Sequence, residues 1–311
     1  MRATRDATHS HLNDAFLAPL SGVETPAGPA SAWWFRGIGT FAEHESDKDY
    51  LGYTDNTYAG VLGYDCLSRN NLMLGGYLGY SMTRLETAND AVTDIDLPIL
   101  GVYAALRLGD YYLAANLSAA SGDADTRRLD PLGHSVTGSY DLDSLGASLE
   151  AGRAFPFFSK GTVRPSLGLQ YTTLSFRDYA ETAQVAETGA VRMDDLRADL
   201  LQAVARIDIG QEIKLPWGHP GMVDIGLGVR QNLHNKRTDI QATLIDHPDA
   251  RLPIRGDKYD DSAVIARLGL RMMLSKTTLF SLSYDYNYIP FGNHRNATRR
   301  DTFIATLRQS W

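Results

Sequence analysis

Residues 277–289 read TTLFSLSYDYNYI, and aromatic or aliphatic side chains alternate with polar ones along this segment. Successive side chains of a β-strand point to opposite faces. The alternation therefore predicts a strand with one apolar face, from Phe280 to Tyr288, and one polar face that includes Ser283 and Asp285.

Several other segments show the same two-residue period, and their polar faces carry charges of both signs. They are residues 95–107, 194–213, 221–237 and 259–274. An unpaired charge inside a soluble core is costly, and an arginine facing lipid at the middle of a bilayer costs about 2–4 kcal/mol. We therefore expect the apolar faces to meet lipid and the charged faces to line a hydrated pore. The predicted pore-lining residues are Arg107, Arg206, Asp208, Asp224, Arg230, Arg267, Arg271 and Asp285.

From Ala32 to the last residue the chain consists of period-2 segments separated by turn residues. The twelve predicted strands are about 32–44, 56–68, 71–86, 95–107, 110–120, 138–153, 161–177, 194–213, 221–237, 259–274, 277–289 and 300–311. Tight turns, such as the one at Gly109-Asp110, alternate with longer polar connections at 121–137, 178–193 and 238–256. Short periplasmic turns and long outer loops are typical of outer-membrane barrels, whereas a soluble β-sandwich has no reason to sort its loops in this way. We predict an all-β fold, a 12-stranded antiparallel transmembrane β-barrel.

Aromatic residues gather near the ends of the predicted strands, which is typical of the girdles that barrels place at membrane interfaces. Examples are the adjacent pairs Trp33-Trp34 and Tyr111-Tyr112, and the final residue, Trp311.

Composition narrows the class further. The 311 residues carry a net charge of −7 and no basic cluster, so we expect no nucleic-acid partner. No segment approaches 18 consecutive apolar residues, which excludes spanning helices but leaves strands open. The single cysteine, Cys66, has no partner for an intramolecular disulfide. Nothing in the sequence calls for a cofactor or a metal ion.

The first 31 residues differ from the rest. Leu12, Phe16 and Leu20 recur at helical spacing within about 5–20, and the helix also contains Asn13. The Pro- and Gly-rich stretch that follows reads as a linker. A helix this short is marginal in water, so we expect it to lie inside the pore; a flexible tail outside the barrel is the alternative. The predicted division is 1–31, pore helix and linker, and 32–311, barrel.

Three segments carry a resemblance to a known family. The first strand contains Trp33-Trp34-Phe35-Arg36-Gly37, the second contains Tyr58-Ala59-Gly60-Val61-Leu62-Gly63-Tyr64-Asp65, and the third contains Gly75-Gly76-Tyr77-Leu78-Gly79-Tyr80. In this order, and with an aromatic residue at the end of the chain, they resemble the autotransporter β-domain family of type V secretion. The resemblance covers nearly the whole chain.

The resemblance implies a translocator and anchor in the bacterial outer membrane, through which an N-terminal passenger polypeptide reaches the cell surface. It implies outer-membrane lipid, the passenger, the barrel-assembly machinery and periplasmic chaperones as partners, a monomeric barrel and no enzymatic activity. The expected C-terminal insertion signal is Phe303, Ala305, Leu307 and Trp311, from which Gln309 departs. Because no secretory signal peptide follows Met1, we expect the chain to be a fragment of a longer exported protein.

Two other classes remain as alternatives. A stand-alone porin would need no N-terminal helix. An outer-membrane hydrolase would place its chemistry in outer loops, where His134-Ser135 is the best candidate, although adjacent residues cannot easily form the hydrogen bond of a triad. Some autotransporters cleave themselves within the pore helix; Asn13-Asp14 lies in that segment. The carboxylates that strand alternation predicts in the lumen include Asp65, Glu86, Glu150 and Asp224. We assign no catalytic residue.

Overall fold

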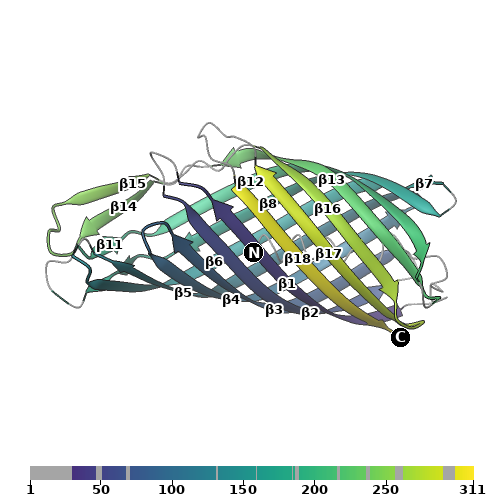
Figure 1. The fold of residues 1–311 in the computed structure, drawn as a ribbon, viewed down its shortest axis with the longest axis horizontal. Coiled ribbons are helices and arrows are strands. Elements are labelled where there is room, and N and C mark those ends of the chain that lie inside the picture. Colours follow the sequence, from purple (N-terminus) through teal and green to yellow (C-terminus); the bar gives the residue numbers. More distant parts are fainter. Residues whose placement is uncertain are drawn as a thin grey trace.

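A computed structural model gives the structure of the protein and describes residues 30–46, 51–67, 71–130, 132–158, 160–183, 185, 189–215, 218–235, 239–255, 262–289 and 298–311. The predicted pore helix lies outside the described residues. Twelve long strands make up the fold (Figure 1). They are β1 (Ala30–His44), β2 (Tyr53–Leu67), β3 (Leu72–Thr87), β4 (Val92–Leu108), β5 (Tyr111–Leu129), β6 (Ser135–Arg153), β8 (Gly161–Phe176), β12 (Leu196–Lys214), β13 (Pro220–Asn235), β16 (Ser262–Met273), β17 (Thr278–Ile289) and β18 (Thr298–Ser310).

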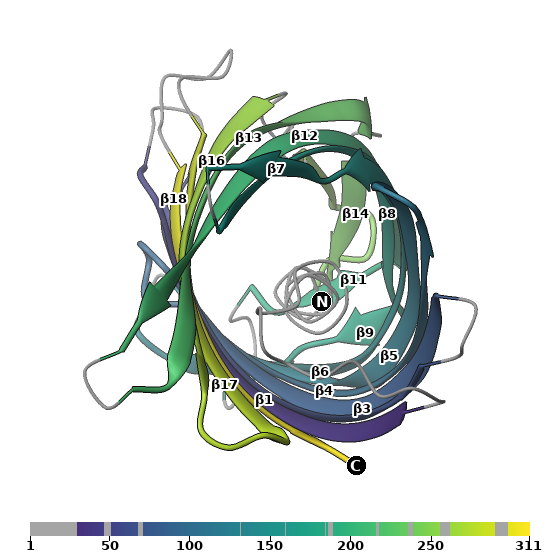
Figure 2. The ribbon, with the colours of Figure 1, turned by 90° about the vertical axis from the view of Figure 1, so that its right-hand side faces the viewer.

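These strands pair in sequence order, all antiparallel, and the sheet closes on itself through the pairing of β1 with β18. Figure 2 looks along the resulting barrel. The strands contain 12 to 19 residues, more than the roughly 9–11 that cross a bilayer when tilted. The predicted 12-stranded antiparallel barrel is confirmed.

No helix in the described part of the chain is long and apolar enough to span a membrane.

The outer connections differ from the prediction. Residues 121–129 and 135–137, expected to be loop, continue the β5–β6 hairpin as far as the pair Leu129↔Ser135. The segments 178–193 and 238–256 contain short strands: β9 (Tyr179–Ala180), β10 (Thr182–Ala183), β11 (Val191–Met193), β14 (Asp239–Leu244) and β15 (Arg251–Arg255). Four of these form a second sheet in the order β15-β14-β11-β9 at one end of the barrel (Figure 1). At the other end, the short strand β7 (Phe155–Phe157) pairs antiparallel with the first residues of β8.

The two faces of the barrel are chemically opposite to those of a soluble protein. Large apolar side chains such as Leu78, Leu167 and Leu227 are more than 60% exposed on the outer face, while charged side chains such as Arg206 and Arg271 are buried. An exposed apolar surface of this extent marks contact with a membrane or a partner. Because it surrounds a closed barrel, lipid is the medium that this surface fits.

The inner wall has two unlike halves, which the sequence reading, expecting a uniformly polar lumen, did not foresee. Along β18 and β1–β6 the buried apolar and aromatic side chains form one cluster, which includes Trp34, Met73, Tyr77, Ile99 and Tyr103. Buried polar side chains such as Arg36, Asn116 and Thr302 lie on the same strands. Along β8, β12, β13, β16 and β17 the buried side chains are mostly arginine, carboxylate, serine and amide. We call these the aromatic wall and the charged wall.

On the aromatic wall, four inward-facing glycines lie beneath rings from a neighbouring strand. The pairs are Gly63 with Trp34, Gly75 with Tyr103, Gly101 with Tyr77 and Gly152 with Tyr112. A Cβ at Gly101 would lie 2.1 Å from the Tyr77 ring. The girdle prediction was therefore wrong for Trp34 and Tyr112, whose rings cover these glycines inside the barrel. Neighbouring residues of a strand face opposite sides, so one member of each adjacent aromatic pair must point inward.

We expect Gly101→Ala to destabilise the folded barrel by about 1–3 kcal/mol, because the added methyl group overlaps the Tyr77 ring. Urea titration of the refolded protein in lipid vesicles measures the loss. In a Tyr77→Ala background the same change should cost much less, since the clash is gone. Gly37→Ala is the matched control, because its Cβ would meet nothing within 4 Å. Equal losses for Gly37→Ala and Gly101→Ala would contradict this role of the ring.

Candidate functional site

The charged wall is built from ion pairs between neighbouring strands. The Arg267 guanidinium on β16 donates through Nε and Nη2 to the Asp285 carboxylate on β17, both at 2.6 Å. Arg271 donates to Asp224 on β13 at 2.8 and 2.7 Å. Bidentate hydrogen bonds of this kind are the strongest contacts between arginine and a carboxylate. They allow charges to be buried without being left unpaired.

The network continues towards β6. Arg164 Nη2 lies 3.5 Å from Asp224 Oδ1. Arg206 Nη2 on β12 lies 3.4 Å from Glu150 Oε2 on β6, and its Nε lies 3.9 Å from Asp208. These ion pairs hold the pore wall together across β8, which separates β6 from β12.

The structure places the eight predicted pore-lining residues as follows. Six of them are buried, and these are Arg206, Asp208, Asp224, Arg230, Arg271 and Asp285. The side chain of Arg267 is 8% exposed, and Arg107 is half-buried. The network also contains Arg164 on β8, which was not predicted, and Glu150 on the adjoining strand β6, which was among the carboxylates expected to reach the lumen.

A second network joins the first strands to the last one, and sequence reasoning missed it. Asp65 on β2 accepts hydrogen bonds from Trp34 Nε1 at 3.0 Å and from the Tyr103 hydroxyl. Its other oxygen accepts from Arg308 Nε on β18, also at 3.0 Å. Asp65 is 1% exposed. The network therefore ties β18 to β2 over the intervening β1.

The residues weighed for catalysis are not brought together. Glu86, expected to reach the lumen, is instead half exposed on the outer side and pairs with Arg84 at 2.7 Å. Asn13-Asp14 lies outside the described residues.

The hydrolase candidate His134 occupies a turn at the tip of the β5–β6 hairpin. Its Nδ1 lies 3.0 Å from Asp130 Oδ2, and Asp130 Oδ1 accepts from the backbone N–H groups of Leu132 and His134. Burial would raise the pKa of the Asp130 carboxyl, but these hydrogen bonds outweigh it and hold the pKa below its ordinary value. The pattern is that of a side chain that caps a turn.

No group of three or more histidine, cysteine or acidic residues in the described part of the chain is arranged to hold a metal ion.

The expected insertion-signal residues lie along the last strand. Phe303, Leu307 and Trp311 are exposed on the outer face, and Ala305 lies between them. The departure at Gln309 has a structural reason: its side chain donates to Thr277 Oγ1 at 2.9 Å and accepts from Thr278 Oγ1 at 2.7 Å. Thr277 belongs to the β16–β17 connection and Thr278 is the first residue of β17, so Gln309 lies at the rim of the barrel and not within the apolar band.

A closed antiparallel barrel with an apolar outer face and a charged inner wall defines an outer-membrane β-barrel protein. Residues 33–285 match the family described as "Autotransporter beta-domain". The chain belongs to the autotransporter β-domain family, as the resemblance implied, and it is a translocator barrel of the bacterial outer membrane.

Similar proteins agree with this assignment. The chain is 27% identical over 288 residues, 91% of its length, to the pertactin autotransporter of Bordetella bronchiseptica, of which it spans 29%. It is also 27% identical over 178 residues to outer membrane protein B of Rickettsia japonica, covering 53% of this chain and 11% of that protein. The chain thus spans less than a third of these relatives.

Solved structures show the same fold. The translocator domain of the autotransporter NalP from Neisseria meningitidis superposes with a TM-score of 0.69 at 15% identity, covering 98% of this chain and 97% of that one. The β-domain of the Bordetella autotransporter BrkA gives 0.67 at 20% identity, covering 91% and 100%.

The short connections between strands should face the periplasm. After Cys66→Ser, we expect an impermeant maleimide to label Leu132→Cys on intact cells, because Leu132 is 76% exposed at the tip of the β5–β6 hairpin. Lys276→Cys, in the β16–β17 turn, should react only after the outer membrane is permeabilised. The opposite labelling pattern would show that the barrel is inverted.

Proposed function

We propose that this barrel anchors an N-terminal passenger polypeptide and lets it cross the outer membrane through the lumen. The observation that carries the proposal is the two-sided interior, with an aromatic wall facing a charged wall. A purely aqueous channel has no use for buried Trp34, Met73 and Ile99 on its inner wall. An amphipathic segment inside the lumen would use both walls, because its apolar side can pack against the aromatic wall and its polar side can face the charged wall.

We assign the segment of residues about 5–20 to this place, as a helix in the pore. Leu12, Phe16 and Leu20 would face the aromatic wall, and polar residues such as Asn13 would face the charged wall. The division into 1–31, pore helix and linker, and 32–311, barrel, is part of the same proposal.

The charge balance of the charged wall suits a moving polypeptide. Within the ion pairs described above, four arginines (Arg164, Arg206, Arg267, Arg271) are matched by four carboxylates (Glu150, Asp208, Asp224, Asp285), and Arg230 is a further buried arginine of this wall. Because most of its charges are paired, the wall exerts only a weak net field. Passenger segments of either charge would therefore pass without being trapped.

The proposed partners follow from this role. Phe303, Ala305, Leu307 and Trp311 would form the signal by which the barrel-assembly machinery inserts the last strand, and periplasmic chaperones would hold the chain beforehand. The barrel would act as a monomer, and its function would include no catalytic step.

Deleting residues 1–20 should raise the single-channel conductance in planar bilayers severalfold, because the lumen loses its occupant. Phe16→Asp, which leaves the length unchanged, should raise it partly, since a charge there no longer fits the aromatic wall. Heat-modifiable migration on gels checks that each variant is folded. A folded deletion variant with unchanged conductance would refute the pore helix. Translocation is tested separately: an epitope placed upstream of residue 1, behind a signal peptide, should become accessible to antibody on intact cells.

A further inference from the structure

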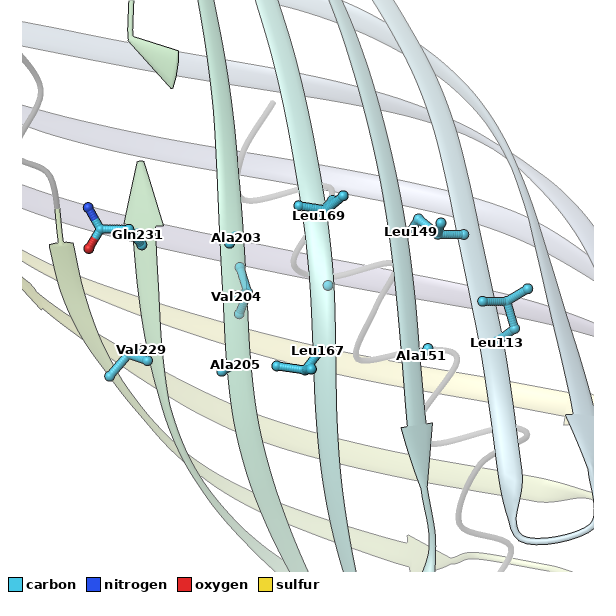
Figure 3. Close-up of a pocket in the computed structure, with 11 residues that line it drawn as sticks. Leu113, Leu149, Ala151, Leu167, Leu169, Ala203, Val204, Ala205, Val229 and Gln231 are labelled. Atoms are coloured by element: carbon cyan, nitrogen blue, oxygen red, sulfur yellow. The ribbon is translucent and has the colours of Figure 1, made fainter. Parts of the chain in front are cut away.

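The outer wall carries an apolar hollow that the translocator role does not use. It has a volume of about 970 Å³, lies across β5, β6, β8, β12 and β13 and reaches Val264 on β16. A second hollow of about 410 Å³ shares Ala151, Leu167, Ala205 and Val229 with it. Figure 3 shows Ala203 and Ala205 of β12 between the leucines of β8 and Val229 of β13. Both hollows are shallow and open to the outside of the barrel.

The hollow exists because alanines lie directly opposite larger side chains on the neighbouring strands. Across the strands, Leu113 pairs with Ala151, Ala151 with Leu167, and Leu167 with Ala205. The next pair is Ala205 with Val229. Each alanine leaves a depression beside a larger neighbour. Elsewhere on the outer face, over β17, β18 and β1, aromatic rings such as Phe41, Tyr284 and Phe303 pack against one another and fill the surface.

The positively charged side chain of Arg153 lies at one end of the hollow. Arg153 is the last residue of β6 and pairs with Tyr111, the first residue of β5. It therefore lies beside the two-residue β4–β5 turn, at the end of the barrel that carries the short turns. Those turns face the periplasm in outer-membrane barrels. The depth of Arg153 is thus that of the lipid headgroups of the periplasmic leaflet.

The Arg153 guanidinium is held in place but is only weakly neutralised. Its Cζ lies 4.9 Å from the centroid of the Tyr111 ring and 4.6 Å from that of Phe155, so the two rings fix its position. Its one carboxylate contact within the described part of the chain is long: Nη2 lies 3.4 Å from Asp110 Oδ2, and both side chains are substantially exposed. Its Nε is buried and has no hydrogen-bond partner among the described residues.

We propose that this hollow and Arg153 together form a binding site for one glycerophospholipid of the periplasmic leaflet. An acyl chain lies in the hollow over Ala151 and Ala205, and the phosphate binds the Arg153 guanidinium. Inside a bilayer an acyl chain is surrounded by other chains in any case, so burial alone gives little preference for one position. Selectivity therefore comes from the phosphate–guanidinium contact, for which arginine geometry is well suited.

Native mass spectrometry of the intact chain with palmitoyl-oleoyl phosphatidylglycerol tests this site. The wild type should retain one tightly bound lipid. Arg153→Ala should weaken that binding by roughly tenfold or more, the size expected for a charged hydrogen bond. Ala205→Phe, which fills the hollow while leaving the cation, should weaken it by a smaller factor. Arg84→Ala is the matched control: Arg84 is also exposed and paired with a carboxylate, but at the opposite end of the barrel, and its loss should leave lipid binding unchanged.

Equal lipid retention by wild type, Arg153→Ala and Ala205→Phe would overturn the proposal. So would a wild-type dimer that Ala205→Phe abolishes, since the hollow would then be an interface between copies. Because the readout is lipid binding by folded protein, its failure is distinguishable from a failure of passenger translocation.

Discussion

Leu268→Arg should prevent most of the protein from inserting stably into a membrane. Leu268 lies near the middle of β16 and is 54% exposed on the outer face. Arginine at the midplane on the lipid side of a barrel costs about 2–4 kcal/mol, which corresponds to roughly 30- to 1,000-fold in the folding equilibrium. Folding into vesicles, followed by the heat-modifiable gel shift at increasing urea concentration, measures the loss.

The matched control places a charge on the other face. Ser283, on the neighbouring strand β17, pairs with Gly269, the residue after Leu268. It lines a small inner cavity together with Arg164, Arg267 and Arg271, so Ser283→Asp, whose short carboxylate would meet these cations, should be tolerated far better. The inward change Gly228→Arg would be a poor control, because even a Cβ there would lie 2.7 Å from the carbonyl oxygen of Ala205. If Leu268→Arg and Ser283→Asp inserted equally poorly, the assignment of the two faces would be wrong.

Asp65→Ala should give the largest loss of stability of any single change on the aromatic wall. Asp65 accepts from three side chains, and its removal leaves the Arg308 cation without its carboxylate and the Trp34 N–H with one acceptor fewer. Breaking a buried charge pair by removing one partner costs about 3–5 kcal/mol. Urea unfolding in lipid vesicles, with the intrinsic fluorescence of the four tryptophans as the signal, measures the stability.

Asp55→Ala serves for comparison, because it removes a carboxylate that also links β2 to β18. Asp55 pairs with Arg300 at 3.7 Å, and both side chains are partly exposed, so the expected loss is below about 1 kcal/mol. Similar midpoints for Asp65→Ala and the wild type would show that the network around Arg308 does not hold the barrel closed.

The barrel itself could be predicted because lipid constrains every second residue. Where the strands leave the apolar band, that constraint ends, and the segment Ser121–Arg128 pairs as strand although no apolar residue alternates along it. Glu86 was assigned to the wrong face for a related reason. The preceding segment, with Tyr77, Leu78 and Tyr80, has large apolar residues on both faces, so its alternation does not decide which face is inward.

The charged site was only partly predictable. The alternation of residues along each strand predicted which arginines and carboxylates face the lumen. It could not predict which of them form ion pairs, because that depends on how neighbouring strands are aligned with one another. The Asp65–Arg308 contact joins residues 243 positions apart. Inward aromatic residues were also missed, because a ring that covers a glycine looks in sequence like a ring at an interface.

The pairing of β1 with β18 has a consequence for the rate of folding. Arg36 Nε donates to Thr306 Oγ1 at 2.8 Å across 270 residues of chain. The entropic cost of closing so long a loop exceeds that of a hairpin of about ten residues by roughly 3 kcal/mol. Contacts of this separation slow folding. Closure of the ring is therefore expected to be the late, slow event, and until β18 arrives the edge of β1 lacks its partner and is open to misassociation.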